Sequence, residues 1–480
     1  MSRLAGQAGR RQPQQSLLSS SAPTHSESQS INEQLALIDA APTSISGFRP
    51  IHYLGNKSRI LDRLEAAINE VARAGTPVCD LFAGSGVVAR RLATNRPVVA
   101  VDVQEYSRVV TSALVNPAPL APGEIDILIR RAALHENDLR MPQVEALIRH
   151  ERQAMADALI GMPDALCDIL EFGSVVASTA SNSLPPSLAE LVSKALSAMP
   201  KGPNSVLTRY YGGIYFSYEQ AVQLDSLAAA VRELDEPTRT TALAALLSTA
   251  SDTVSTVGNQ FAQPIRPRTS DGRAKGAVIR IVARSRLTPS IPLYRHWIQM
   301  YGRLRPTVGP HSVIRSDFRD ALASPPTDFA AIYADPPYTR DHYSRFYHVL
   351  ETIALGDEPV VSTVSINGAT QLSRGLYRGE RHQSPFCVKS TVNSAFQGLF
   401  QAAKNLAVPL VLSYSPYASG TPSRLQPRLM TVPTLVELAH EYFREVRLES
   451  AGRIAHSKLN KDELNGAIEH GAEILISAIP

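Results

Sequence analysis

The residues from Thr76 to Asp102 constrain the fold of this chain more than any other segment. They read as a short apolar strand, an acid and a glycine-rich turn (TPVCDLFAGSG), then a helix over 87–93 and a second apolar run that ends in Asp102. Gly84 and Gly86 permit backbone conformations that other residues avoid, and they let a ligand approach the main chain closely. An acid at the tip of the second strand of a doubly wound sheet can accept hydrogen bonds from ribose hydroxyls. A lone Gly-x-Gly is usually only a turn, but the ordered set predicts an α/β fold with a nucleoside-bearing cofactor.

A second motif, Asp335-Pro336-Pro337-Tyr338, follows an apolar run over 329–334 and reads as a strand that ends in a rigid turn. Two consecutive prolines fix φ and remove two backbone donors, so the groups around them point into open space. The turn therefore presents a carboxylate, a proline carbonyl and an aromatic face together. These groups can hold a planar exocyclic amine and stack on its ring. The competing interpretation is a strand-ending turn without a chemical role.

A third motif precedes both. The run IHYLGNKSRI over 51–60 places Tyr53, Gly55 and Lys57 in close succession before an amphipathic helix expected over 61–72. Taken alone, this motif would be read as a turn and a helix start.

Together the three motifs resemble the adenine-N6 DNA methyltransferases of the DNA adenine methylase type. The positions that match the motifs of this family are Tyr53, Gly55, Lys57, Asp80, Phe82, Gly84, Gly86, Asp102 and Asp335 to Tyr338. The resemblance covers about residues 48–120, 205–265 and 310–480. It implies an S-adenosylmethionine-dependent DNA methyltransferase with a Rossmann-like class I methyltransferase sheet and a long, mainly helical inserted target-recognition region.

The resemblance also implies roles for the catalytic residues. The adenine amine is a poor nucleophile because its lone pair is delocalised into the ring. Accepting hydrogen bonds from both amine hydrogens localises the lone pair, and Asp335 and the carbonyl of Pro336 are the candidate acceptors. Tyr338 would stack on the base, which must first leave the duplex. Pro337 completes the rigid turn.

The cofactor contacts follow in the same way. The resemblance implies that Tyr53 and Lys57 meet the methionine part of S-adenosylmethionine and that Asp102 meets the ribose. Asp80 would support the glycine turn. Asp317 lies at the distance before the catalytic strand that the family uses for an adenine-ring contact, but a helix cap is an equal interpretation because FRDAL follows it.

Basic residues are concentrated in one stretch. Ten lysines and arginines between Gln263 and Pro306 stand against one acid, in a chain whose net charge is +4. Arg266 and Arg268, at the start of this stretch, are candidates for contact with double-stranded DNA. Arg340 and Arg345, directly after the tetrapeptide, are candidates for its phosphates, as is the basic loop 374–382. The alternative for all of them is a solvated basic surface.

The chain divides into four expected parts. Residues 1–47 are rich in Ser, Gln, Ala and Pro and predict a disordered tail. Residues 48–115 and 311–480 predict the two halves of the catalytic domain, and 116–310 the inserted region. Periodicity predicts helices over 145–159, 186–199, 217–234, 240–254 and 432–444, and strands over 408–413 and 472–477.

Composition excludes some classes of protein. No apolar run approaches the length of a transmembrane helix, which predicts a soluble protein. Three cysteines at unrelated spacings predict neither a disulfide framework nor a metal site. We therefore expect a reducing, intracellular setting with no metal and no membrane contact. The resemblance implies a cytoplasmic, bacterial or phage-encoded enzyme that is a monomer or dimer.

Alternative functions remain open at this point. They are DNA cytosine-N4, RNA or protein-amide methylation, and a catalytically silent DNA-binding relative. Cytosine-C5 methylation is disfavoured because it needs an attacking thiolate. The resemblance fits either the modification enzyme of a restriction system, with a cognate endonuclease, or a stand-alone or phage enzyme. The recognition sequence stays open because residues 115–203 match no pattern in the family and Asn56 replaces a common glycine.

Overall fold

The computed structural model describes residues 48–55, 57–178, 184–256, 258–337, 340, 342–366, 369–415, 429–452 and 473–480. All of them belong to the compact unit Ser44–Pro480, one of two into which the chain divides. The tail expected over 1–47 and Tyr338 of the tetrapeptide lie outside the described residues.

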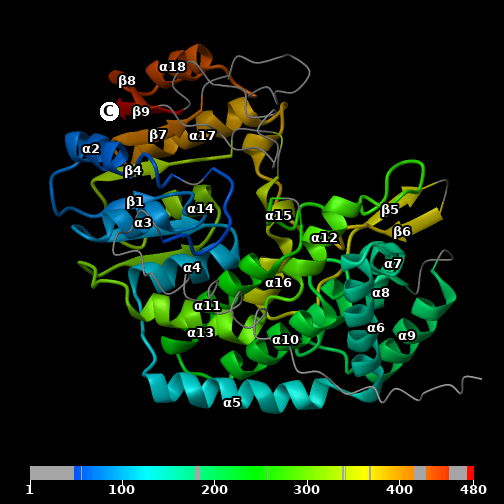
Figure 1. Cartoon of the computed structure of the whole chain (residues 1–480). Helices are drawn as coiled ribbons and strands as arrows, with labels where there is room; N and C mark the ends of the chain where they lie inside the picture. Colours follow the sequence, from blue (N-terminus) through cyan, green and yellow to red (C-terminus); the bar gives the residue numbers. More distant parts are fainter. Residues whose placement is uncertain are drawn as a thin grey trace, which may run out of the picture. The chain divides into compact units, whose positions relative to one another are not determined.

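Within these residues, seven strands form one sheet in the order β3-β2-β1-β4-β7-β9-β8 (Figure 1). Their bounds are β1 (Val78–Asp80), β2 (Val98–Asp102), β3 (Ser312–Arg315), β4 (Ala331–Ala334), β7 (Leu410–Tyr414), β8 (Glu445–Gly452) and β9 (Glu473–Ile479). The strands from β3 to β7 in this order run parallel, whereas β9 is antiparallel to both of its neighbours. The mainly parallel sheet confirms the predicted α/β, Rossmann-like class.

The register of the central strands brings three acids to one edge of the sheet. Asp80, at the end of β1, is paired with Ala100 of β2 on one side and with Tyr333 of β4 on the other. Asp102 lies two residues after Ala100, and Asp335 lies two residues after Tyr333. All three acids therefore lie at the carboxyl ends of adjacent strands. Because the chain order reverses between β1 and β4, this edge is where an open α/β sheet binds its ligands.

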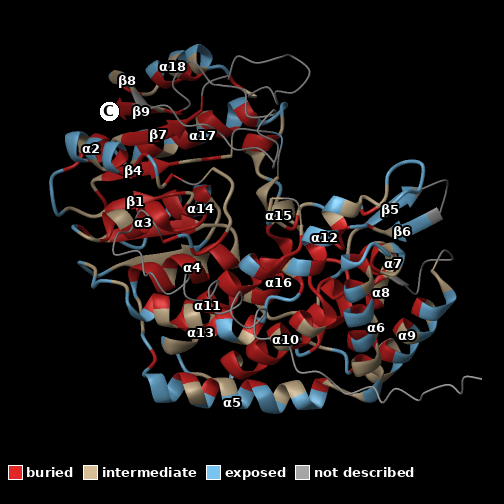
Figure 2. Ribbon diagram, viewed as in Figure 1, coloured by how far each residue is buried: buried red, intermediate tan, exposed pale blue. Residues whose placement is uncertain are grey.

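Helices cover both faces of the sheet. On one face lie α2 (Leu61–Val71) and α3 (Val87–Leu92), and the apolar positions of α2 recur on one side of the helix and are buried. On the other face lie α14 (Phe318–Ala323), α17 (Val392–Asn405) and α18 (Val432–His440). Figure 2 shows buried residues concentrated between these layers.

The described part of 116–310 contains helices but no strand. Its elements are α5 (Pro122–Leu139), α6 (Pro142–Leu159), α7 (Asp164–Phe172), α8 (Val175–Ser178), α9 (Pro186–Ala198), the π-helix η2 (Leu207–Tyr211), α10 (Tyr218–Arg232), α11 (Thr238–Thr253), α12 (Gly276–Ser285) and α13 (Ser290–Gly302). The small, apolar helix α11 is buried on nearly all sides, as its composition predicts. A target-recognition role for this region stays a prediction.

One hydrophobic core joins this helical region to the two halves that flank it. Val109 of α4 (Glu105–Val115), Leu246 of α11 and Leu350 of α16 (His348–Leu355) belong to the same buried cluster. The boundaries predicted at 115 and 310 stay a prediction, and packing is continuous across them.

Several elements differ from the prediction. The hairpin of β5 (Thr363–Ile366) and β6 (Ala369–Leu372), the strand β8, α15 (Tyr343–Phe346) and the 3-10 turn η3 (Pro385–Cys387) were not expected. Helix α18 ends at His440, four residues before the predicted end. The reason is that Arg444 already donates its backbone N–H to Ile479, at 3.0 Å, and so belongs to the sheet.

Along the described ranges, no helix combines the length and the apolar character that a membrane crossing requires.

Candidate active site

A cavity of about 810 Å³ opens at the carboxyl edge of β1, β2 and β4. Its lining includes seven of the predicted site residues, namely Tyr53, Phe82, Asp102, Asp317, Asp335, Pro336 and Pro337. A smaller cavity of about 270 Å³ adjoins it, with Tyr53, Phe82 and Asp335 in both linings, and is also bordered by Gly55, Lys57 and Asp80. The sheet therefore brings together residues that are up to 284 positions apart in the chain (53 to 337).

The glycine turn is built around Asp102. One carboxylate oxygen of Asp102 accepts the backbone N–H of Gly84 and the other accepts that of Gln104, each at 2.9 Å. Burial raises the pKa of Asp102, while these two donors lower it. Gly84 has φ +54°, and a Cβ there would lie 2.5 Å from the Tyr53 hydroxyl. The turn thus needs glycine, and the ring of Tyr53 lies directly against it.

A buried lysine connects the first motif to the tetrapeptide. The Nζ atom of Lys57 lies 3.0 Å from Oδ1 of Asp335 and 2.9 Å from Oε1 of Glu473. The side chains of Lys57 and Glu473 are 5% and 1% exposed, and that of Asp335 is 18% exposed. Ser413 of β7 also donates to Glu473. Burial raises the pKa of Asp335 to about 7. The charge of Lys57 lowers this pKa, and the like charge of Glu473 raises it.

Glu473 was not predicted from the sequence. It begins β9, 416 residues after Lys57, and is the one charged residue of an otherwise uncharged strand, EILISAI. The sequence did contain one indication of its role: an acid at the start of an apolar strand is expected to be buried, and buried acids are normally paired with a cation.

Asp80 is the unsatisfied acid of the site. Both of its carboxylate oxygens are buried, and neither has a hydrogen-bond partner among the described residues. Burial raises the pKa of Asp80 to about 8, and the like charge of Asp335 is the next largest cause. The backbone N–H of Ala89 lies nearby and lowers this pKa, but it is not within hydrogen-bond geometry. A buried carboxylate without donors is costly for the protein alone. Its position on the smaller cavity therefore favours a cationic ligand there.

Aromatic rings hold the first motif in place. The ring of Tyr53 stacks on that of Tyr347, with centroids 5.1 Å apart, and lies 5.6 Å from that of Tyr343. The hydroxyl of Tyr347 accepts the backbone N–H of Leu54 at 2.7 Å. On the opposite wall, Phe82 and Phe318 lie 5.7 Å apart. The cavity thus has aromatic surface next to its acids.

Asp317 fits both interpretations that the sequence left open. Its side chain caps α14 by accepting the backbone N–H of Arg319 at 3.0 Å, so the helix cap is confirmed. Asp317 also lines the larger cavity, and a contact with the adenine ring of a cofactor stays a prediction.

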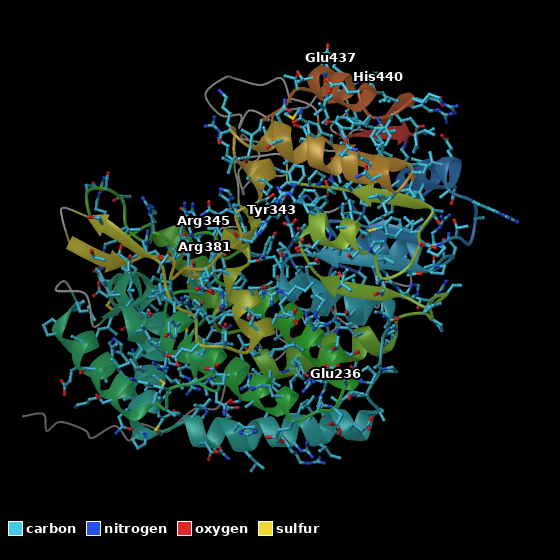
Figure 3. The ribbon with its side chains drawn as sticks, turned by 180° about the vertical axis from the view of Figure 1, so that it is seen from behind. Glu236, Tyr343, Arg345, Arg381, Glu437 and His440 are labelled. Carbon is cyan, nitrogen blue, oxygen red and sulfur yellow. The ribbon has the colours of Figure 1, made fainter. Side chains whose placement is uncertain are left out.

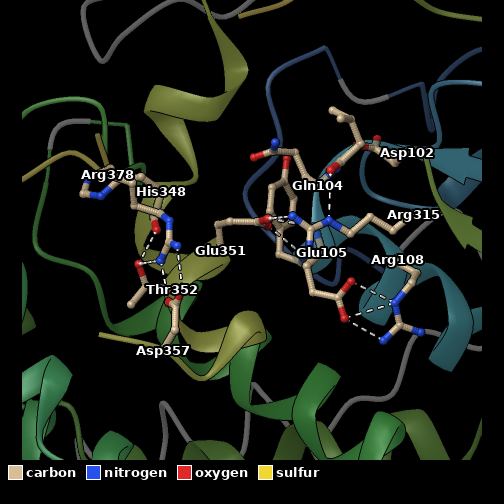
Figure 4. Close-up of polar contacts among 12 residues, drawn as sticks. Asp102, Gln104, Glu105, Arg108, Arg315, His348, Glu351, Thr352, Asp357 and Arg378 are labelled. Atoms are coloured by element: carbon tan, nitrogen blue, oxygen red, sulfur yellow. Dashed lines mark hydrogen bonds and ion pairs between the residues drawn. The ribbon is translucent and has the colours of Figure 1, made fainter. Parts of the chain in front are cut away.

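The helix that follows Asp102 is capped from a distant helix. Helix α4 begins at Glu105, and the carboxylate of Glu351 on α16 accepts the backbone N–H groups of Glu105 and Tyr106, each at 3.0 Å (Figure 4). These hydrogen bonds connect α16, which follows the tetrapeptide in the chain, to the start of α4, which follows Asp102. Glu351 was not expected from the sequence.

The candidate DNA-contacting arginines lie in different surroundings. Arg266 and Arg340 are exposed. Arg268 forms ion pairs with Asp168 and Glu171 on α7, so its expected contact with DNA is untested and competes with these pairs. Arg345 lies in α15, next to Tyr343, a residue of the cavity wall (Figure 3).

The basic stretch is also less uniform than its sequence indicates. Arg286 is fully buried and pairs with Glu151, which is buried too, and Arg295 pairs with Asp126. Arg280 and Arg284 on α12 are exposed. Part of the stretch therefore stabilises the helical region, and the rest presents positive charge to solvent.

The mainly parallel sheet, with a cavity at its carboxyl edge, is consistent with a Rossmann-like methyltransferase fold. Residues 53–159 match the sequence profile of the family described as D12 class N6 adenine-specific DNA methyltransferase. The chain is also 23% identical to the type II methyltransferase M.NlaIII of Neisseria lactamica over 364 residues, which are 74% of this chain and 80% of that protein. The resemblance to adenine-N6 DNA methyltransferases predicted from the motifs is therefore confirmed.

Proposed function

We propose that this protein is a site-specific DNA methyltransferase that transfers a methyl group from S-adenosylmethionine to the N6 amine of an adenine rotated out of the duplex. The observation that supports this most strongly is the position of Asp335. It stands at the tip of β4, is held by Lys57, and borders both the cavity with the glycine turn and the wall formed by Pro336 and Pro337.

The residues of the two cavities fit S-adenosylmethionine. When bound, the cofactor supplies an electrophilic methyl group on a cationic sulfonium. The unpartnered carboxylate of Asp80 and the paired one of Asp335 both border the smaller cavity, and both favour a cation over a neutral ligand. Asp102, at the tip of β2, is the proposed acceptor for the ribose hydroxyls, and Asp317 is the proposed contact of the adenine ring. Tyr53 and the glycine turn of Gly84 close the site between these carboxylates.

Asp335 is the proposed acceptor for one amine hydrogen of the target adenine. Lys57 occupies Oδ1 of this carboxylate, which leaves Oδ2 for the amine. The carbonyl of Pro336, a residue of the cavity wall, is the proposed acceptor for the second hydrogen. The two acceptors localise the amine lone pair, and fixing the amine in an attack geometry can contribute several kcal/mol, within the range of about 7–11 kcal/mol known for such effects.

The substrate is proposed to be double-stranded DNA with its target base flipped, since the N6 amine cannot reach a closed cavity from within the stack. Aromatic surface from Tyr53 and Tyr343 lies at the cavity. Tyr338 is the proposed stacking residue. The name of the relative, a type II methyltransferase, supports a modification enzyme of a restriction system, with a cognate endonuclease as its partner. A monomer or dimer in the cytoplasm is proposed for this function.

The test is methyl transfer from labelled S-adenosylmethionine to unmethylated genomic DNA by the purified protein and by Asp335→Ala. We expect the variant to lose activity by about 10²-fold or more, as is typical when a group that acts in the transition state is removed. Asp328→Ala is the matched control, because Asp328 is exposed and precedes the same strand.

The control is expected to retain full activity. Equal activity in Asp335→Ala and Asp328→Ala would contradict the proposal. Cofactor binding by both variants, measured by calorimetry, would show that any loss arises in catalysis and not in folding.

A further inference from the structure

Two arginines beside the cavity share a single aromatic ring. The guanidinium carbons of Arg345 and Arg381 each lie 5.0 Å from the centre of the Tyr377 ring. Nη2 of Arg345 also donates to the Tyr377 hydroxyl at 3.3 Å, and Nε of Arg381 donates to the carbonyl of Arg378 at 2.8 Å. Two like charges are therefore held close together by contacts with neutral groups.

This pair lacks the counter-charge that neighbouring arginines have. Arg378 is held by both carboxylate oxygens of Asp357, at 2.6 Å each (Figure 4). Along the part of the chain that the structure describes, neither Arg345 nor Arg381 forms an ion pair, and Nε of Arg345 is buried without a partner. Burial, and then the charge of Arg345, lowers the pKa of Arg381. An anion between the two guanidinium groups would relieve this repulsion.

The arginine pair is placed at the rim of the larger cavity. Ser344 and His382 both line that cavity, and the Ser344 hydroxyl donates to the His382 carbonyl at 2.6 Å. Arg345 and Arg381 are the chain neighbours of these two residues, so their Cα atoms lie about 3.8 Å from those of the cavity wall. Figure 3 shows Arg345 and Arg381 close to each other and near Tyr343.

We propose that Arg345 and Arg381, held by Tyr377, bind the DNA backbone phosphate that flanks the nucleotide whose base occupies the cavity. The inference rests on the proposed function, and within the basic loop 374–382 it names Arg381 as a phosphate ligand and Tyr377 as the residue that positions the pair. A guanidinium group matches the geometry of phosphate oxygens and binds them with charge-assisted hydrogen bonds. A base can enter the cavity only with its own backbone at the rim, so the nearest phosphate of the strand meets this pair.

The experiment compares the double variant Arg345→Gln/Arg381→Gln with a charge-matched control, Arg63→Gln/Arg73→Gln. Arg63 on α2 and Arg73 directly after it are exposed and lie outside the helical region. The binding of a fluorescent mixed-sequence duplex is measured from 50 to 300 mM NaCl (roughly the range over which phosphate contacts are screened), together with the KM for genomic DNA and for S-adenosylmethionine. The double variant should raise the KM for DNA about tenfold and lower the salt slope by about 0.9. The KM for S-adenosylmethionine should not change.

Variants of Tyr377 distinguish a phosphate site from simple packing. Tyr377→Phe keeps the ring that holds both arginines, whereas Tyr377→Leu removes it, so only the leucine variant should reproduce the loss of DNA affinity. All variants should bind the cofactor with wild-type affinity, which shows that they are folded.

Wild-type salt slope and KM for DNA in Arg345→Gln/Arg381→Gln would refute the phosphate site. That result differs from failure of the proposed function, in which the wild-type protein itself would methylate no DNA. A loss of DNA affinity as large in the Arg63→Gln/Arg73→Gln control would likewise refute it, since the effect would then follow net charge alone.

Discussion

At the scale of single residues, the candidate active site contains more carboxyl groups than cationic groups. Lys57 is one cation among Asp80, Asp335 and Glu473, and all four groups are largely buried. Buried carboxylates of this kind are costly unless they are paired or bind a cation. The arrangement therefore favours a positively charged cofactor, and it makes the ionisation of Asp335 depend on its neighbours.

The first prediction concerns pH and Glu473. Asp335 can accept from Lys57 at Oδ1 and from the target amine at Oδ2 only when it is ionised. Burial raises its pKa to about 7, with Lys57 lowering it and Glu473 raising it. Tyr333 and Asp80 are the other titratable groups that face this carboxylate. At limiting cofactor, kcat/KM should therefore fall as the pH drops through about 7.

Glu473→Gln removes a like charge but keeps a hydrogen-bond acceptor for Lys57 and Ser413. The acid limb of the pH profile should then move to lower pH, while Glu441→Gln, an exposed control before β8, should leave it in place. A purely structural role for Glu473 would lower the rate at every pH and leave the position of the limb unchanged, contrary to this account.

At the scale of elements, the position of Asp102 depends on a helix cap that comes from far along the chain. The first turn of α4 has no cap from the side chain of its own N-cap residue, Gln104, and Glu351 of α16 supplies two acceptor oxygens instead. Free N–H groups at a helix start are normally satisfied in this way. The start of α4 lies directly after the acid that holds the glycine turn, so the cap fixes one wall of the site.

We predict that Glu351→Ala lowers the stability of the protein by about 1–3 kcal/mol, because two buried donors lose their acceptor. Thermal denaturation with and without S-adenosylmethionine measures this. The cofactor should also bind more weakly, since Asp102 becomes less well positioned. Glu351→Gln keeps one acceptor oxygen and should recover part of both losses. A melting temperature equal to that of the wild type for Glu351→Ala would show that the cap is not needed.

Local patterns in the sequence predicted the elements that carry the motifs. The strand, glycine turn and helix from Val78 to Leu92 follow from short-range rules on apolar runs and glycine. The buried helix α11 follows from its small apolar composition. The contacts that complete the site could not be predicted, because they join distant residues: Glu473 lies 416 residues from Lys57, and Glu351 lies 246 from Glu105.

The missed hairpin of β5 and β6 is a different case. The sequence between its strands is Asn367-Gly368, flanked by threonine, valine and isoleucine, which is a strong local indication of a hairpin. The hairpin was nevertheless not predicted. The place of Tyr377 between two arginines, in contrast, depends on tertiary packing alone.

At the scale of the whole molecule, the helical region and the sheet form one continuous structure. The buried cluster that contains α11 and α13 also contains residues of α4 and α16, and these two helices reach the cavity through Tyr106 and through the cap by Glu351. In the proposed function, the sheet presents Asp335 to the displaced base, and a target-recognition role of the helical region stays a prediction.

The measurement that tests the central claim most directly is the identity of the methylated nucleoside. Unmethylated genomic DNA is incubated with the protein and S-adenosylmethionine carrying a deuterated methyl group, then digested, and its nucleosides are resolved by mass spectrometry. The account predicts label in N6-methyladenine, and none in that nucleoside with Asp335→Ala. Label in N4-methylcytosine alone, or in RNA or protein but not in DNA, would contradict it.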